Sequence, residues 1–219
     1  MKIVCISWIL FLLFSLSGCG KNNSKEIQTV VQTLPAPEAP LPGEQDDINS
    51  LVAEENSYRM AAGQALLSPG LTCTLHNLSA TMPSAIPASL PSAVATFVYQ
   101  GSFNQPDGPA SAGLNILPSA LKLTYVSWFL VQCSGQIVII DNDYALFKLT
   151  SDDGSKLFLD GTLLVNNDGN HGAIMLQGSK LMRRGVHSFK LQYMQGPAGN
   201  QALILENALG VIPGNRFYR

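Results

Sequence analysis

The chain has 219 residues, of which 46% are hydrophobic and 13% charged, and its 13 Lys and Arg against 15 Asp and Glu give a net charge of −2. A weakly acidic chain has no electrostatic attraction to a polyanion, so the composition excludes nucleic-acid partners. The length allows one domain with additional terminal segments.

The N-terminal stretch "MKIVCISWILFLLFSLSGC" combines a basic start at Lys2, an apolar run and small residues before Cys19. This order is typical of an export signal, and the run is shorter than the roughly 20 apolar residues that span a bilayer. The ending "LSGC" resembles the bacterial lipobox. The resemblance implies a signal peptide over residues 1–18, a lipid on the Cys19 sulfur, and a membrane-anchored protein of the bacterial cell envelope. Gly20 after the cysteine favours the outer membrane and leaves the leaflet open.

Residues 19–45 are predicted to form a flexible linker, because closely spaced prolines disfavour a helix. Residues 46–69 follow as an amphipathic segment, helical over about 47–66, with Asp46 or Asp47 as N-cap and "SPG" as its end. We expect its apolar stripe to pack on the following domain, since its polar face is acidic. The stripe consists of Ile48, Leu51, Val52, Tyr58, Ala62 and Leu66.

Residues 70–219 show short apolar segments separated by turn signals, which predicts an all-β, antiparallel sandwich or barrel. The expected strands are "LTCTLHNL", "AVATFVYQGSF", "ALKLTYVSWFLV", "GQIVIIDNDYALFKLTS", "KLFLDGTLLV", "HSFKLQYM" and "QALILENALG". Asp160-Gly161 predicts a type I′ hairpin turn, since both residues tolerate a positive φ. The segment "NQPDGPASAG" is expected to be a loop.

Two of the four cysteines are left for pairing, because Cys5 lies in the signal and Cys19 would carry lipid. Outside the cytoplasm an even pair predicts a disulfide between Cys73 and Cys133. Their separation of 60 residues corresponds to about 4 kcal/mol of stabilisation in the chain-entropy model.

The residues that usually carry catalysis or bind zinc are not grouped. His76, His171 and His187 lie in separate segments, without zinc-ligand spacing, and no serine stands in a Gly-x-Ser-x-Gly elbow. We therefore expect no enzyme activity.

The most informative stretch is "TSDDGSKLFLDGTLLVNNDGNHG" at residues 150–172. In a regular strand, the side chains of the adjacent Asp152 and Asp153 point to opposite faces, which argues against an acid–base pair. Two interpretations remain, a turn and a site for a hard cation such as calcium, which binds oxygen ligands. Further oxygens are available on Asn166, Asn167, Asp168 and Asn170.

Two segments, "YALFKLTSDDGSKLFLDGTLLVNNDGNHG" and "GSKLMRRGVHSFKLQYMQGPAGNQALIL", resemble the protective-antigen fourteen-kilodalton (PA-14) domain family. The shared elements are the Ser-Asp-Asp-Gly-Ser motif, the Asp-Gly hairpin, the Asn/Gly-rich loop ending at His171, and the strand ending at Tyr193. The resemblance implies a β-sandwich over residues 70–219, in a family whose enzymes carry catalysis in a separate domain.

In the lectins of that family, two consecutive aspartates joined by a cis peptide bind calcium, and the calcium holds sugar hydroxyls. The matching positions are Asp152 and Asp153. Gln195 lies nearest to the asparagine that the lectins add, Asn200 is the other candidate, and the loop "MQGPAGNQ" has no aromatic residue to stack on a sugar.

The sequence therefore predicts a lipid-anchored envelope protein that binds surface or cell-wall carbohydrate with calcium, for adhesion or glycan recognition. The alternative is a structural or protein-interaction module without a metal or glycan site.

Overall fold

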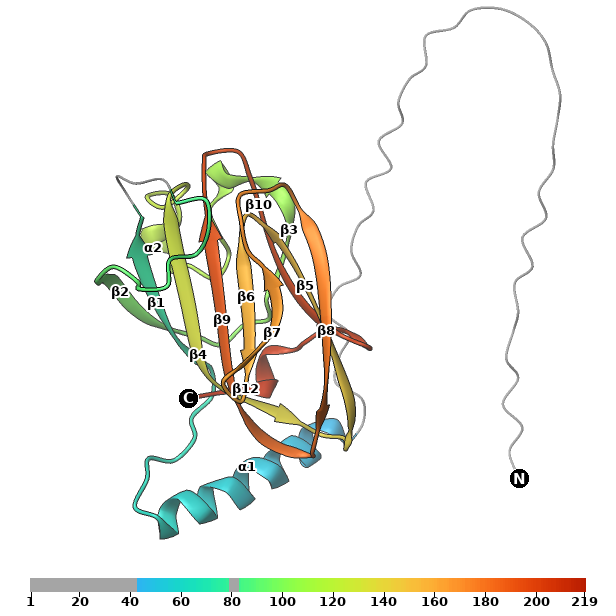
Figure 1. Cartoon of the computed structure of the whole chain (residues 1–219). Coiled ribbons are helices and arrows are strands. Elements are labelled where there is room, and N and C mark those ends of the chain that lie inside the picture. Colours follow the sequence, from blue (N-terminus) through green and yellow to red (C-terminus); the bar gives the residue numbers. More distant parts are fainter. Residues whose placement is uncertain (1–42, 79–82) are drawn as a thin grey trace, which may run out of the picture. The chain divides into compact units, whose positions relative to one another are not determined.

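The computed structural model describes residues 43–78 and 83–219, where two antiparallel sheets form a sandwich (Figure 1). One sheet has the strand order β2-β1-β4-β9-β6-β7, with β12 paired to β4; the other has the order β11-β10-β5-β8, with β3 paired to β10. The expected all-β sandwich is therefore confirmed. The proposed signal peptide, the lipidated Cys19 and most of the linker lie outside the described residues.

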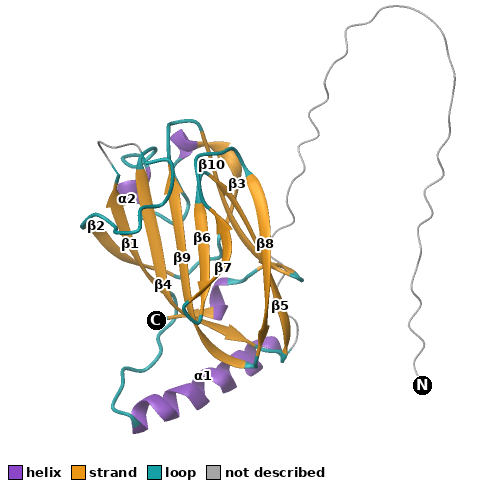
Figure 2. Ribbon diagram, in the orientation of Figure 1, coloured by secondary structure: helices purple, strands orange, loops and turns teal. Residues whose placement is uncertain are grey.

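The elements are coloured by type in Figure 2. The helices are α1 (Glu44–Ala61), α2 (Ser119–Lys122), and the 3-10 helices η1 (Ala110–Ala112) and η2 (Gly214–Arg216). The strands are β1 (Leu71–Asn77), β2 (Ala93–Tyr99), β3 (Asn104–Pro109), β4 (Phe129–Ile139), β5 (Asp143–Asp152), β6 (Ser155–Leu159), β7 (Thr162–Asn167), β8 (Ile174–Met182), β9 (Gly185–Gln195), β10 (Asn200–Asn207), β11 (Gly210–Val211) and β12 (Phe217–Tyr218). No helix within these described ranges has the length and apolar character needed to cross a membrane.

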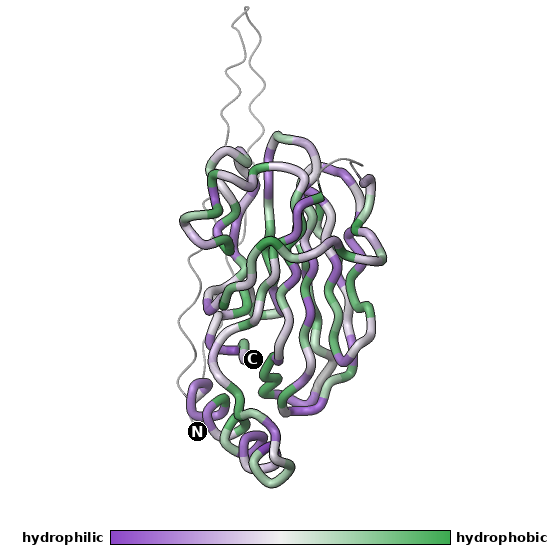
Figure 3. The backbone as a smooth tube through the Cα atoms, turned by 90° about the vertical axis from the view of Figure 1, so that its left-hand side faces the viewer, coloured by the Kyte–Doolittle hydropathy of each residue, from purple (hydrophilic) through white to green (hydrophobic). Residues whose placement is uncertain are grey.

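The main core lies between the two sheets, where alternate residues of each strand point inward. Burial alternates along β1 and β6, and hydrophobic and hydrophilic residues alternate along many strands (Figure 3). Phe103, Phe189 and Phe217 form an aromatic cluster with ring centroids 5.1–6.3 Å apart. Such a core fixes strand register, because a shift by one residue would turn the apolar side chains to the solvent.

The predicted disulfide between Cys73 and Cys133 is confirmed. The two cysteines lie directly opposite each other on the neighbouring strands β1 and β4, and both side chains are buried. The bond therefore fixes the register of two adjacent strands within the core.

Helix α1 begins and ends earlier than the sequence pattern predicts. Gly43, with a φ of 92°, precedes the helix, so Asp46 and Asp47 lie in its first turn and neither caps it. The helix ends at Ala61, followed by Gly63 with a φ of 67°, a conformation that glycine adopts without steric cost. The segment that includes Leu66 therefore leaves the helix, and that side chain is exposed.

Helix α1 packs against the sandwich through only part of the expected stripe. Ile48 and Leu51 are buried with Val138 of β4, whereas Tyr58 is exposed. Two ion pairs add to this contact: Glu44 with Arg216 at 2.8 Å, and Asp47 with Arg184 at 2.7 Å.

The strand expected over residues 120–131 is wrong in its first half. Residues 119–122 form α2, which begins after Pro118, and Leu121 and Tyr125 pack on the core with the i, i+4 spacing of a helix. Trp128 has a φ of 52°, which strand geometry does not allow, and β4 begins at the next residue.

The segment "NQPDGPASAG", expected to be a loop, contains strand β3 and helix η1. Strand β3 includes two prolines, which lack a backbone N–H, and such strands pair on one side only. Its partner is β10. This pairing brings Asp107 to the end of the sandwich where β5 ends.

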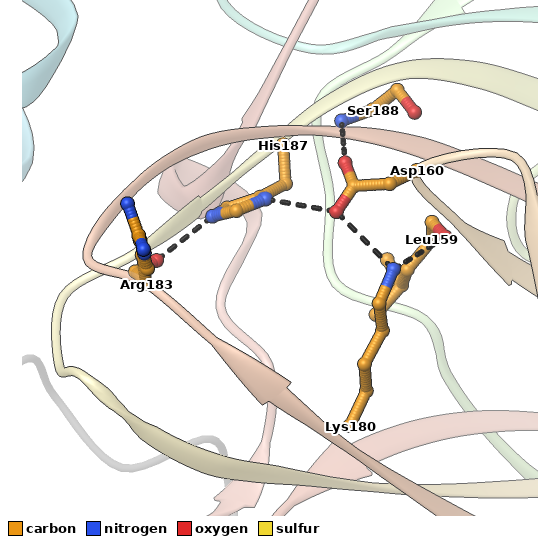
Figure 4. Close-up of polar contacts among 6 residues, drawn as sticks. All are labelled: Leu159, Asp160, Lys180, Arg183, His187 and Ser188. Atoms are coloured by element: carbon orange, nitrogen blue, oxygen red, sulfur yellow. Dashed lines mark hydrogen bonds and ion pairs between the residues drawn. The ribbon is translucent and has the colours of Figure 1, made fainter.

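The Asp160-Gly161 turn joins β6 and β7, and its φ angles of 49° and 74° confirm the predicted positive values. Figure 4 shows how Asp160 ties this turn to the neighbouring strands. Its carboxylate lies 3.0 Å from His187 Nδ1 and 3.4 Å from Lys180 Nζ, and accepts a hydrogen bond from Ser188 N at 3.1 Å. Burial by itself raises the pKa of Asp160, but these hydrogen bonds and the charge of His187 outweigh burial and lower the pKa below its ordinary value.

We expect Asp160→Asn to preserve the turn, since Asn-Gly is favoured in type I′ turns, and to lower the free energy of unfolding by less than about 1 kcal/mol at pH 7. A lowered pKa means that the ionised carboxylate stabilises the fold above its ordinary pKa, and that this contribution is lost as the pH falls through the folded-state pKa. Urea unfolding between pH 7 and pH 2 should therefore show a smaller decrease in the free energy of unfolding for the variant than for the wild type. Equal losses would contradict the assignment.

Candidate functional site

Three connections meet at the end of the sandwich opposite to α1 (Figure 1): β5–β6, β7–β8 and β9–β10. Strand β5 ends there at Asp152, and β9 ends there at Gln195. Asp152 and Asp153 are joined by a cis peptide bond, as the family resemblance implied. This end of the molecule, which we call the loop end, contains the acidic pair.

Asp153 connects the three loops. Its Oδ1 accepts a hydrogen bond from His171 N at 2.9 Å, and its Oδ2 accepts one from Gly196 N at 2.8 Å. A Cβ atom at position 196 would lie 3.0 Å from Asp153 Oδ2 and 2.8 Å from Asn170 Oδ1, so glycine allows this close approach. Burial raises the pKa of Asp153, and the two backbone N–H groups act in the opposite direction.

Asp152 is nearly as deeply buried as Asp153 but differs from it in the hydrogen bonds to its carboxylate. Its side chain is only 8% exposed, yet no residue in the described ranges donates a hydrogen bond to its carboxylate. Burial, followed by the charges of Asp153 and Asp107, raises the pKa of Asp152 to about 6, and His171 offsets this only in part. Of the two carboxylates, that of Asp153 accepts two backbone hydrogen bonds, and that of Asp152 has no hydrogen-bond donor among the described residues.

Gln195 is fully buried beside this pair. Its Nε2 lies 3.4 Å from Asp153 Oδ2, 3.0 Å from the main-chain oxygen of Asn200 and 3.3 Å from that of Pro197. Its Oε1 accepts a hydrogen bond from the hydroxyl of Tyr193, which also contacts the main-chain oxygen of Asp152 at 2.5 Å. The side-chain oxygen Oε1 of Gln195 thus faces the Tyr193 hydroxyl, and its side-chain nitrogen Nε2 faces the carboxylate of Asp153.

The β7–β8 loop residues serve mainly to hold the loop. Asn167 is buried and donates to Ser151 Oγ and to the main-chain oxygen of Ile174, both at 2.9 Å. Asp168 pairs with Lys156 at 2.6 Å and accepts a hydrogen bond from Ile86 N at 2.8 Å. The amide nitrogen of Asn167 and the carboxylate of Asp168 are therefore engaged with partners other than the acidic pair.

The other predicted positions differ in their distance from the pair. Asn166 is exposed on β7, and nothing brings it to the aspartates. Asn200 is exposed; its side chain donates to Asp107 at 3.3 Å, and its main-chain oxygen accepts from Gln195. Both nitrogens of the His171 ring face main-chain oxygens, of Gly172 at 2.8 Å and of Asn167 at 3.1 Å.

Sequence reasoning missed two contributors. Asp107 was hidden in a segment expected to be a loop, and only the pairing of β3 with β10 brings it near Asp152. Trp128 N donates to the main-chain oxygen of Gly196 at 3.0 Å, so a tryptophan adjoins the loop that itself contains no aromatic residue. The positive φ of Trp128 has no sequence signal in an apolar run.

The oxygen donors fit calcium in part. Calcium takes six to eight oxygens from carboxylates, carbonyls and water. No group of three or more His, Cys, Asp or Glu suited to a metal occurs among the residues described, so donors beyond the two aspartates would be amide oxygens, main-chain oxygens or water. Such oxygens are present: those of Pro197 and Asn200 face the same point as Asp153 Oδ2, the point now taken by Gln195 Nε2.

Several solved structures share the fold of this domain. The PA14 domain of the MpAFP antifreeze protein has a TM-score of 0.54 at 14% identity, and the alignment covers 69% of this chain and 91% of that one. A PA14 sugar-binding domain from an RTX adhesin has a TM-score of 0.51 at 18% identity, with 68% and 97% covered. These likenesses establish the fold.

A third structure is an anti-sigma factor domain-containing protein from Clostridium clariflavum, with a TM-score of 0.52 at 19% identity. The alignment covers 69% of this chain but only 47% of that protein, so the chain spans about half of its length. A search of curated proteins finds no match. The family model of the PA14 domain matches residues 127–210, from the residue before Trp128 to β11. The fold and this match agree: the PA14 family model matches residues 127–210, and two of the solved structures with the same fold are PA14 domains.

Proposed function

We propose that the loop end binds carbohydrate, with a calcium ion held by Asp152 and Asp153. The observation that carries the proposal is Asp152, a residue only 8% exposed whose carboxylate lies beside a second carboxylate and receives no hydrogen bond among the described residues. A buried charge without a partner is costly, and a cation is the partner that two adjacent carboxylates suit best. The sugar-binding PA14 domain of the RTX adhesin supports carbohydrate as the ligand class.

Each residue has a distinct task in this proposal. Asp152 supplies the carboxylate that lacks a protein partner, and Asp153 keeps the three loops in register around it. Calcium, when bound, supplies positive charge and coordination positions for sugar hydroxyls. The backbone of Trp128 holds Gly196 through the hydrogen bond from its N–H, and the Trp128 side chain packs on the hydrophobic cluster of Leu78, Ile86, Leu130 and Met194. The proposal is one of recognition without catalysis.

A glycan array probed with the full chain tests this function. We expect binding in calcium that is lost in chelator, and lost also in Asp152→Asn, which keeps the shape of the side chain and removes its charge. Asp160→Asn, at the opposite end of β6, is the matched control and should bind as the wild type does. An array that stays blank for the wild type in calcium would refute the proposal.

One observation favours a structural module instead. Both oxygens of Asp153 are used by backbone N–H groups, and this bracing works without any ligand. A structural module would give a blank array, and removing both aspartates would lower the stability equally with and without calcium.

The lipobox resemblance adds a proposal on location. A lipid on Cys19 would hold the domain at the bacterial cell envelope, with the outer membrane favoured. Cys19→Ser should then release the chain from the membrane fraction, and retention of the variant there would contradict the anchor.

A further inference from the structure

The amide group of Gln195 occupies a position that is otherwise surrounded by oxygen. Three acceptors face its nitrogen: Asp153 Oδ2 at 3.4 Å and the main-chain oxygens of Pro197 and Asn200 at 3.3 and 3.0 Å. We call these three atoms the oxygen cradle. If the amide were turned over, Oε1 would face the three cradle oxygens with no donor between them, although Asp153 Oδ2 would keep its hydrogen bond from Gly196 N. The network itself therefore fixes the orientation of the amide.

An oxygen cradle of this kind is also the donor set of a hard cation. The amide nitrogen brings two N–H donors but no net charge. It therefore satisfies the main-chain oxygens while leaving the charge of the two aspartates uncompensated. A divalent cation would both bind the main-chain oxygens and compensate the charge of the aspartates. It cannot enter the cradle, however, while Gln195 Nε2 lies there.

The hydroxyl of Tyr193 gives the amide a second satisfied orientation. It contacts both Gln195 Oε1 and the main-chain oxygen of Asp152, and with one proton it donates to only one of them at a time. With the amide turned over, Gln195 Nε2 would donate to the Tyr193 oxygen, and the hydroxyl would donate to Asp152. In the second orientation all of these buried groups are paired, provided that a cation sits in the cradle, whereas in the first the single Tyr193 proton is shared between Gln195 Oε1 and the main-chain oxygen of Asp152.

We propose that Gln195 is a switch in which its amide nitrogen closes the oxygen cradle in the cation-free protein, and its carbonyl oxygen turns into the cradle when a divalent cation binds. The proposal rests on the calcium site proposed above and concerns its regulation. It makes calcium compete with an internal hydrogen-bond donor, so the wild-type site binds calcium more weakly than its oxygens alone would allow.

Gln195→Glu separates the two orientations, because a carboxylate of the same length accepts but does not donate. Calorimetric titration of the full chain should show calcium binding at least about tenfold tighter in Gln195→Glu than in the wild type. In chelator the variant should unfold at a lower temperature, and calcium should restore it. Gln192→Glu is the matched control: it adds the same charge on the same strand, where Gln192 donates to Gln132 at 2.9 Å, and should change neither property.

The side-chain NH₂ signals of Gln195 in a ¹⁵N-labelled full chain, assigned by their absence in Gln195→Glu, give a second measurement. They should shift on saturation with calcium, while those of Gln132 and Gln192 stay in place. Unmoved Gln195 signals in a calcium-loaded protein, or equal affinity in wild type and Gln195→Glu, would overturn the switch. Absence of calcium binding in both proteins would overturn the switch together with the proposed calcium site, whereas calcium binding of equal strength in both would overturn the switch alone. A working switch with a blank glycan array would refute only the carbohydrate proposal.

Discussion

Asp153→Ala is expected to lower the free energy of unfolding by about 2–5 kcal/mol in chelator. The alanine leaves His171 N and Gly196 N without their acceptor in a buried site, and each unpaired N–H costs about 1–3 kcal/mol. The loss should appear as a lower urea midpoint with an unchanged slope.

Asp107→Ala is the control for this substitution. It removes a carboxylate from the same end of the domain, but Asp107 is exposed and, among the residues that the structure describes, accepts one hydrogen bond, at 3.3 Å from Asn200. We expect a change within about 0.5 kcal/mol, as for most surface substitutions. If Asp153→Ala were as mild as Asp107→Ala, Asp153 would not brace the loops.

The neighbouring substitution, Asp152→Asn, should have the opposite sign and raise the free energy of unfolding by about 1 kcal/mol at pH 8 in chelator. This value is smaller than the pKa shift alone implies, because solvent screens part of the interaction. The physical reason is that folding buries a charged group beside Asp153 and Asp107 without giving it a hydrogen-bond donor. With calcium the order should reverse, since the wild type gains stability from the ion and Asp152→Asn loses that ligand.

The pH dependence of stability gives an independent check on Asp152. Its pKa rises from an ordinary value of 3.8 to about 6 in the fold, so the folded protein holds more protons than the unfolded chain between these values. In chelator, this group's contribution is fully present below the unfolded-state pKa and is lost as the pH rises through about 6. Thermal unfolding of Asp152→Asn should lack this loss. A variant that is less stable than the wild type in chelator would contradict the assignment.

Those parts of the fold that depend on neighbouring residues followed from the sequence. The Asp160-Gly161 turn needs only two adjacent residues that tolerate positive φ. The Cys73–Cys133 pairing joins distant residues, and it followed instead from the cysteine count and the expected export of the chain. The acidic pair was likewise visible as a motif, and its cis peptide came with the family resemblance.

The parts that depend on distant contacts did not follow from the sequence. Strand β3 has a composition typical of a loop, and only its pairing with β10 makes it a strand. The apolar run from Ala120 was expected to be extended, but packing on the core selects a helical turn there. Which end of the Gln195 amide faces Asp153 depends on the whole hydrogen-bond network, and no sequence pattern encodes it.

Strand β9 runs the full height of the sandwich, from Gly185 near the α1 end to Gln195 at the loop end. Its 11 residues correspond to about 35 Å at roughly 3.3 Å per residue. The Debye length at physiological ionic strength is about 8 Å, so the ion pairs around α1 are electrostatically insulated from the aspartates at the other end. Charge substitutions on α1 can therefore alter how that end is held without changing the affinity of the distant site for a cation.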